Sequence, residues 1–327
     1  MVNKKSIILL TGLSFIIFCQ SCHNKQPQIT PVDCANFPAP TSSFGYDYTS
    51  ADTTNYTPYY NPSNNNEIVF TRYVIMTDTI TQSTSYDVKL YKANIISGNT
   101  FTIGTFSGWP KWGSTGWIVI GGNGDNICKI KSDGTNLTQL THSDFNYDPD
   151  WSPDGNKIVF RKDVNNTAAM LYIMNSDGSN QVIFDSVKGA FVPSWSPDGK
   201  KIAYYVDINE SGYLSYTDTT THQKVILSDL DKNEPITSIS WFPDSKWVIW
   251  ATRKGLYKIN VDTKEKIKLR SNCDSRQYNC PSVSADGINF ILYRVDSKII
   301  KANTVYTTRN IYMMNADGTN ETKVNLK

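Results

Sequence analysis

The sequence contains few of the residues on which catalytic and nucleic-acid-binding sites usually depend. Three histidines occur in 327 residues, and one of them, His23, lies beside the hydrophobic N-terminal segment. The formal net charge is only +2, and lysine and arginine form no stripe along the chain. Because a nucleic-acid-binding surface needs clustered basic side chains, we expect no nucleic-acid partner.

Recognisable catalytic motifs are also missing. The chain has no Gly-x-Ser-x-Gly turn, no His-Glu-x-x-His zinc motif and no glycine loop that would open a helix and hold phosphate. The other two histidines, His142 and His222, fall in expected loops, and no Cys and His spacing suits zinc. We therefore predict no catalytic residue, metal or cofactor. Catalysis by carboxylates that separate loops bring together stays open.

The only long hydrophobic run is N-terminal, where residues 7–18 form an apolar stretch of 12 residues after a basic start. This run is too short to span a bilayer comfortably and suits the core of a signal peptide. Cys19-Gln-Ser-Cys22 follows, and the arrangement resembles a bacterial lipoprotein signal with small Ser21 before the acceptor cysteine. The resemblance implies a signal peptide over residues 1–21 and lipidation of Cys22. Ordinary secretion with cleavage nearby is the alternative.

Residues 22–50 have the composition of a tether. They contain four prolines among Gln, Thr, Ser and Asn, and such a stretch cannot bury much apolar area. With a lipid on Cys22, this segment would hold the folded domain off a membrane. We therefore expect a location in the bacterial cell envelope, either periplasmic or associated with the outer membrane.

A repeated phrase dominates the rest of the chain. Pro-Ser-Trp-Ser-Pro-Asp-Gly-Lys-Lys-Ile-Ala-Tyr occupies residues 193–204, and a near copy occupies residues 149–160. Each copy predicts a short strand, a tight turn at Ser-Pro-Asp-Gly and a second strand. Weaker copies bring the total to six, and they begin at residues 58, 110, 149, 193, 239 and 281.

A second half-motif follows the phrase. Leu-Tyr-Ile-Met-Asn-Ser-Asp-Gly at residues 171–178 has a close counterpart at residues 311–318, and Asp-Gly between apolar runs is a strong hairpin signal. Each unit therefore contains four antiparallel strands. Six such units predict an all-β fold, a six-bladed β-propeller over residues 51–327.

The two half-motifs together resemble the repeat of TolB-type propellers, and the resemblance covers about residues 55–327. It implies six blades, in agreement with the count. TolB proteins carry an α/β domain ahead of the propeller, whereas only the tether stands there in this chain. The resemblance therefore implies the fold, and no individual residue supports the contact that TolB makes with a peptidoglycan-associated lipoprotein.

The tryptophans of the phrase are expected to be structural. We predict that they wedge between neighbouring blades, and that Trp195→Ala would cost about 3–5 kcal/mol. The predicted wedges are Trp112, Trp151, Trp195 and Trp241.

The cysteines beyond the signal segment suit an oxidising compartment. Cys273 and Cys280 bracket a short loop, and in an exported protein such a pair predicts a disulfide. Cys128 lies in an expected strand and is interpreted as a small buried hydrophobe. The state of Cys34 in the tether is left open.

Residues entering the innermost strands should ring one mouth of the central channel. Aromatic and acidic side chains there suit stacking on a sugar or holding a peptide, although they could instead only cover blade edges. The predicted binding residues are Tyr56, Trp109, Tyr147, Asp148, Phe191 and Tyr278.

These observations favour an envelope-tethered, non-catalytic propeller that binds a protein, peptide or glycan through its mouth. We expect a monomer that meets the membrane through its lipid anchor. Two other hypotheses stay open: a carbohydrate-active lyase or hydrolase that uses mouth carboxylates, and a structural envelope protein without a small ligand.

Overall fold

The computed structural model describes the chain from residue 47, with short gaps. The described ranges are residues 47–50, 53–77, 84–106, 108–123, 125–142, 145–164, 168–208, 211–230, 234–301 and 304–327. The predicted signal peptide, Cys22 and nearly all of the tether lie outside these ranges. The described residues form strands and turns, and none of their segments is a helix that could cross a membrane.

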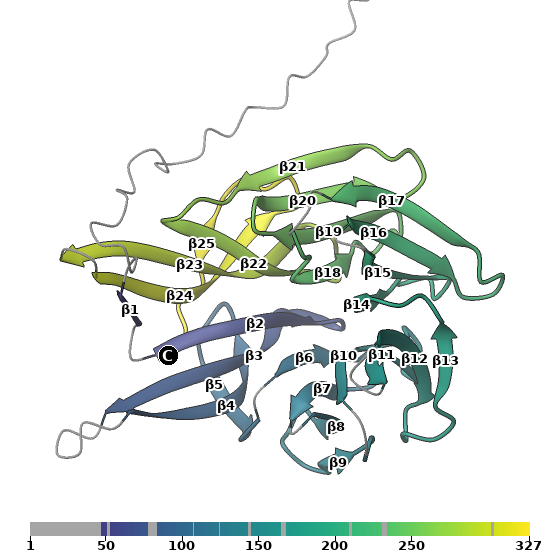
Figure 1. Ribbon diagram of the computed structural model, residues 1–327. Coiled ribbons are helices and arrows are strands. Elements are labelled where there is room, and N and C mark those ends of the chain that lie inside the picture. The colour runs from purple at the N-terminus through teal and green to yellow at the C-terminus, as the bar shows by residue number, and fades with distance from the viewer. Residues whose placement is uncertain are drawn as a thin grey trace, which may run out of the picture. The chain divides into compact units, whose positions relative to one another are not determined.

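Six four-stranded antiparallel sheets, the blades, follow one another along the chain (Figure 1), which confirms the predicted all-β propeller. The innermost strands are β2 (Thr53–Asn61), β6 (Trp109–Trp112), β10 (Phe145–Trp151), β14 (Ala190–Trp195), β18 (Ser238–Trp241) and β22 (Arg276–Val283). Each contacts the innermost strand of the next blade, and β22 contacts β2, so the ring is closed.

The other strands lie progressively further out. The second strands are β3 (Asn64–Thr77), β7 (Trp117–Asn123), β11 (Lys157–Val164), β15 (Lys201–Ile208), β19 (Trp247–Thr252) and β23 (Asn289–Lys301). The third strands are β4 (Thr84–Asn94), β8 (Asn126–Lys131), β12 (Ala168–Asn175), β16 (Ser211–Asp218), β20 (Gly255–Asn260) and β24 (Thr304–Asn315). The outer strands are β5 (Thr100–Gly104), β9 (Thr138–Gln139), β13 (Val182–Asp185), β17 (Lys224–Leu230), β21 (Lys266–Ser271) and β25 (Thr322–Lys323).

Side chains of blades one and six pack together where the ring closes. Ile68 and Phe70 of blade one share a buried cluster with Ile291 of blade six and with Val324 near the C-terminus. The N–H group of Lys327 donates to the Gly98 carbonyl at 2.8 Å. One further strand, β1 (Asp47–Ser50), pairs in parallel with the start of β24.

The repeated turn is stabilised by one serine and one aspartate. In blades three, four and six the serine hydroxyl donates to the aspartate carboxylate at 2.6 Å, and it accepts the N–H group five residues further on. The glycine that follows has a positive φ in all three blades. The Ser-Pro-Asp-Gly sequence is therefore a structural turn, as predicted.

The Asp-Gly turns of both half-motifs should make the fold sensitive to acid. The Ser152 hydroxyl holds the pKa of Asp154 below its usual range, and Ser179 and Thr319 act likewise on Asp177 and Asp317. A lowered pKa stabilises the fold above the unfolded-state value, about 3.9, and the benefit is lost as pH falls through the folded-state pKa. We expect the melting temperature to drop below about pH 4 and to drop less in Asp154→Asn. A melting temperature that is constant or rising from pH 7 to pH 3 would contradict this expectation.

Three of the predicted wedges fill the spaces between blades. Trp112, Trp151 and Trp241 are 4–6% exposed, and each packs in a cluster shared by its own blade and the preceding one. The indole N–H of Trp151 donates to the Lys111 carbonyl at 3.2 Å, and that of Trp241 donates to the Ser194 carbonyl at 3.0 Å. These bonds join neighbouring innermost strands.

Trp195 has a different orientation. It is only partly buried, and its indole N–H donates to the Gly199 carbonyl of its own turn at 3.1 Å. Because less of the ring is removed from water, the loss of 3–5 kcal/mol expected from the sequence applies to the buried wedges, and Trp195→Ala should cost less.

The predicted disulfide between Cys273 and Cys280 is wrong, because Cys280 is a free, buried thiol. Cys273 pairs with Arg276, and Cys280 lies four residues further along the extended strand β22. Four residues of extended strand place Cys280 about 13 Å from Arg276, the residue that pairs with Cys273, whereas a disulfide joins Cα atoms within about 7 Å. Cys273 is itself disulfide-bonded, but not to Cys280. Cys128 is buried, as predicted.

Candidate functional site

Four innermost strands have the same irregularity just before the leading proline of the phrase. Their pairing with the second strand shifts register there, and the residue before the proline has a positive φ. These residues are Thr57 (48°), Asp148 (51°), Val192 (45°) and Cys280 (51°). Proline cannot donate a ladder hydrogen bond, so the strand bulges. A left-handed conformation costs roughly 1–2 kcal/mol for an L-residue, and such strain is common at functional sites.

The bulged residues of the neighbouring blades three and four meet inside the channel. Asp148 and Val192 line a cavity of about 30 Å³ together with Trp109 and Lys111. The Lys111 Nζ atom lies 4.5 Å from the centroid of the Tyr59 ring. A space of this size holds about one water, so this cavity admits no larger ligand.

Burial is the main influence on the pKa of two acids in blade three, Asp148 and Asp150. It raises the pKa of Asp148 despite the opposing charge of Arg161, and it raises the pKa of Asp150 despite Lys111. Asp150 also accepts the N–H groups of Trp151 and Trp195, at 3.1 and 2.9 Å. Both carboxyl groups are therefore already occupied by partners within the fold.

Three of the predicted binding residues surround one arginine that the sequence interpretation missed. The Arg161 guanidinium carbon lies 4.5 Å from the Tyr147 ring centroid and 5.1 Å from the Phe191 centroid. Arg161 also binds Asp148 at 3.3 Å and Asp163 at 3.0 Å. The carboxylates hold the guanidinium in place between two aromatic rings from neighbouring blades. We call these five residues the Arg161 cluster.

Arg161 could have been found from the hairpin register. It pairs with Tyr147 across β10 and β11, directly after the apolar end of the repeated phrase. The Tyr147 hydroxyl donates to Asp125 at 2.5 Å, and burial together with this bond raises the pKa of Tyr147 to about 12. Tyr147 is therefore held by Asp125 at its hydroxyl and by Arg161 over its ring face.

Tyr56 belongs to a second aromatic group, where blades one and six meet. Its ring centroid lies 4.8 Å from that of Tyr73 and 5.4 Å from that of Tyr293, and the Arg309 guanidinium carbon is 5.3 Å from it. Arg309 has no carboxylate partner among the described residues. The long hairpins β3–β4 and β23–β24 extend beyond the innermost strands beside this group (Figure 1).

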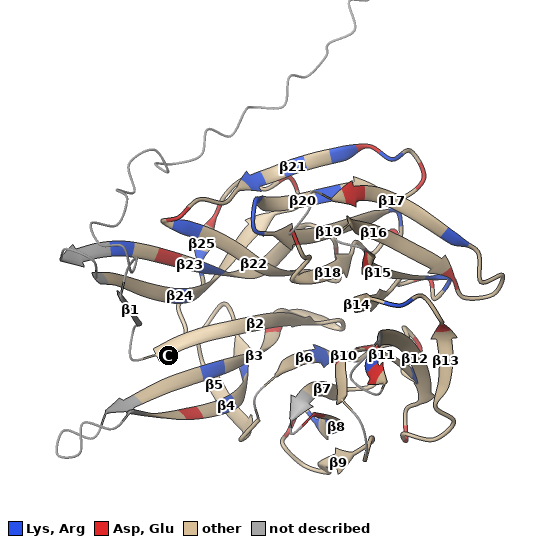
Figure 2. Ribbon diagram, viewed as in Figure 1, with Lys and Arg blue, Asp and Glu red and all other residues tan. Residues whose placement is uncertain are grey.

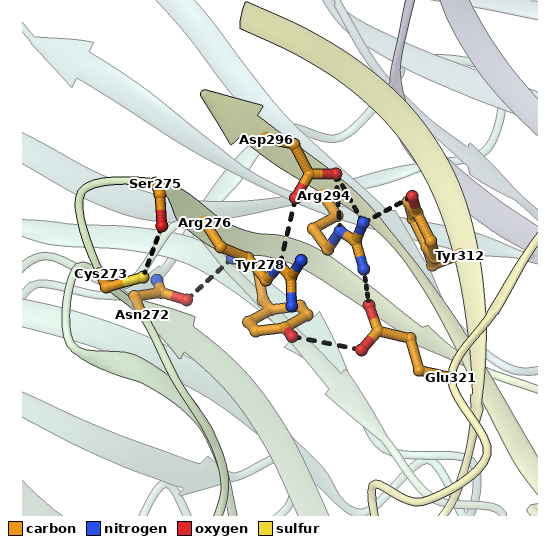
Figure 3. A network of polar contacts seen from close by, with 9 residues as sticks. All are labelled: Asn272, Cys273, Ser275, Arg276, Tyr278, Arg294, Asp296, Tyr312 and Glu321. Carbon is orange, nitrogen blue, oxygen red and sulfur yellow. Dashed lines mark hydrogen bonds and ion pairs between the residues drawn. The ribbon is translucent and has the colours of Figure 1, made fainter. Parts of the chain in front are cut away.

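Trp109 is 45% exposed, and it lines the same narrow cavity as Asp148. Tyr278 lies elsewhere: it is 3% exposed and packs in the cluster between blades five and six. Its hydroxyl donates to Glu321 at 3.2 Å, as Figure 3 shows, within a network centred on Arg294. Side chains alternate between faces along a strand. Tyr278 stands two residues before the bulge, whereas Tyr56, Tyr147 and Phe191 stand one before it, so it points between the blades.

The described residues contain no group of three His, Cys, Asp or Glu side chains that could hold a metal ion. Of the acids at the mouth, Asp148 and Asp163 are bound to Arg161. Figure 2 shows basic and acidic segments interspersed over the blades. The Arg161 cluster therefore offers aromatic faces and a guanidinium rather than a free carboxylate.

A protein-family model described as the TolB beta propeller domain matches residues 84–277. No curated protein matches the sequence. Many solved structures resemble the fold, with low sequence identity.

The putative TolB of Agrobacterium tumefaciens aligns with a TM-score of 0.60 and 15% identity, over 71% of this chain and 86% of that one. TolB of Acinetobacter baumannii aligns with a TM-score of 0.53 and 20% identity, over 65% of this chain and 53% of that one. The chain thus spans about half the length of the second protein. An oligogalacturonate lyase in complex with manganese aligns with a TM-score of 0.50 and 12% identity, over 80% and 90%. At these identities the likenesses show the fold alone.

Proposed function

Because the chain belongs to the TolB beta propeller domain family, we propose that it is a non-catalytic scaffold that binds a protein segment at its channel mouth. The observation that carries this proposal is the Arg161 cluster. Two carboxylates fix its guanidinium, which contacts two aromatic rings from different blades. Fixed aromatic and arginine side chains are what the centres of protein interfaces use. Their positions cost little entropy on binding, because they are already ordered.

The alternative function, a carbohydrate-active lyase or hydrolase, has less support. Such an enzyme needs an acid or base whose lone pairs are free to meet the substrate. Asp148, Asp150 and Asp163 instead bind Arg161 or backbone N–H groups. The likeness to the lyase concerns the fold and carries no residue of a site to this chain.

The test is capture from a bacterial envelope extract by the whole chain, with analysis of both protein and saccharide in the eluate. We expect one protein to be enriched in proportion to the chain, and we expect added oligosaccharides to remain intact during prolonged incubation. Cleavage of an oligosaccharide by the chain would overturn the proposal in favour of the enzyme.

We also propose that the propeller is tethered to the envelope through a lipid on Cys22. The support is the 12-residue apolar run followed by Ser21 and Cys22. Expression of the full chain in bacteria with a clickable palmitate analogue should label the wild-type protein. Label should be lost in Cys22→Ser and kept in Cys19→Ser. Equal labelling of both variants, or no label on the wild type, would contradict lipidation at Cys22.

A further inference from the structure

A second cavity, of about 560 Å³, lies between blades three and four near their hairpin turns. It is separate from the mouth, which lies at the opposite ends of the innermost strands. Blade three contributes Ile173, Ile183 and Phe184 to its walls, and blade four contributes Trp195 and His222. A volume of this size is typical of ligand pockets in proteins.

The orientation of Trp195 accounts for the cavity. At the neighbouring interfaces, Trp151 and Trp241 cross to the preceding blade and donate to its innermost strand. Trp195 donates to Gly199 in its own turn instead, so its indole forms a wall of the cavity rather than filling it. The Phe184 and His222 rings, with centroids 5.5 Å apart, form another part of the wall.

Much of the cavity wall is apolar, and several of its polar groups are already bonded. The Trp195 N–H is bonded to Gly199, and the carboxylates of Asp154 and Asp198, which also line the cavity, accept hydrogen bonds within their own turns. An apolar side chain would meet rings and aliphatic groups on several sides.

The apolar surface continues from the cavity onto the outer strand β13. Val182 and Ile183 of this strand are 58% and 51% exposed. β13 pairs only with β12, so the backbone groups along its other side face no described strand. An exposed apolar edge strand is a template for another strand. Lys157 also lines the cavity, is exposed and has no carboxylate partner among the described residues.

We propose that this cavity binds an extended protein segment that pairs with β13 and places a large apolar side chain against Trp195. An acidic residue in the segment would meet Lys157. Addition of a strand to a sheet edge supplies backbone hydrogen bonds, and pockets for alternate side chains supply specificity. The site does not depend on the mouth, so the two binding functions can fail separately.

The test uses a displayed library of random linear peptides, selected on the whole chain. We expect the selected peptides to combine an aromatic or large aliphatic residue with a nearby acid. Ile183→Asp should weaken their binding at least about tenfold, because it places a charge beside the apolar side chain. The matched control is Ile226→Asp, since Ile226 is 53% exposed on β17, the outer strand of blade four, and does not line the cavity.

Two further arms complete the experiment. Lys157→Ala should weaken acidic peptides more than neutral ones, and the double variant Tyr147→Ala/Phe191→Ala at the mouth should bind the selected peptides as the wild type does. Equal loss in Ile183→Asp and Ile226→Asp, peptides that respond only to the mouth variant, or no selected peptide at all would overturn the proposal. Thermal melts of each variant show that the fold is kept.

Discussion

Replacement of Trp241 by alanine is expected to lower the free energy of unfolding by about 3–5 kcal/mol. The ring is 5% exposed and packs between Leu214 and Leu227 of blade four and Val248 of blade five. Its removal would leave a cavity between two blades. It would also leave the Ser194 carbonyl without its indole partner, which adds to the loss.

Two variants separate the contributions to this loss. Trp241→Phe keeps most of the apolar volume and loses the N–H group, so we expect a cost of about 1–2 kcal/mol. Trp195→Ala removes a partly exposed ring, and we expect about 1–2 kcal/mol there as well. Chemical denaturation of the three variants measures all the values. An equal loss in Trp241→Ala and Trp195→Ala would contradict the distinction between buried wedge and cavity wall.

The second large effect is expected at the mouth. The double change Tyr147→Ala and Phe191→Ala removes both rings that flank Arg161. Truncation of an aromatic residue at the centre of an interface commonly costs 2 kcal/mol or more, so we expect the affinity for the captured envelope protein to fall by about two to three orders of magnitude.

The matched control for this variant changes an aromatic ring away from the mouth. Phe101 on β5 is 51% exposed, and Phe101→Ala should leave the affinity unchanged. Titration by surface plasmon resonance measures both variants. Equal binding by the mouth variant and the wild type, with both folded, would remove the mouth from the function.

Much of the fold could be predicted because the repeated phrase combines a turn that only a few residues allow with an apolar pattern of period two. All six predicted starting positions fall within innermost strands. The long hairpins of blades one and six could not be predicted, because their ends contain polar residues without a regular pattern. The orientation of Trp195 also depends on a choice between two carbonyl acceptors, which the sequence does not distinguish.

The site could be predicted only in part, because a strand bulge decides which residues face the mouth. Tyr147 and Phe191 stand directly before the bulged residue, and the structure places both against Arg161. Tyr278 stands one residue earlier, on the opposite face, where it is buried. Cys280 occupies the bulge itself, which carries it away from Cys273.

The most direct test of mouth binding is site-specific photocrosslinking in envelope extract. A photoreactive phenylalanine analogue in place of Trp109, which is 45% exposed and lies beside Asp148, should crosslink one envelope protein. The same analogue in place of Ile226 on β17 should give no adduct with that protein. We expect the Trp109 adduct to disappear when Tyr147 and Phe191 are both alanine. Adducts with the same protein from both positions, or an adduct at Trp109 that survives the double change, would contradict binding through the mouth.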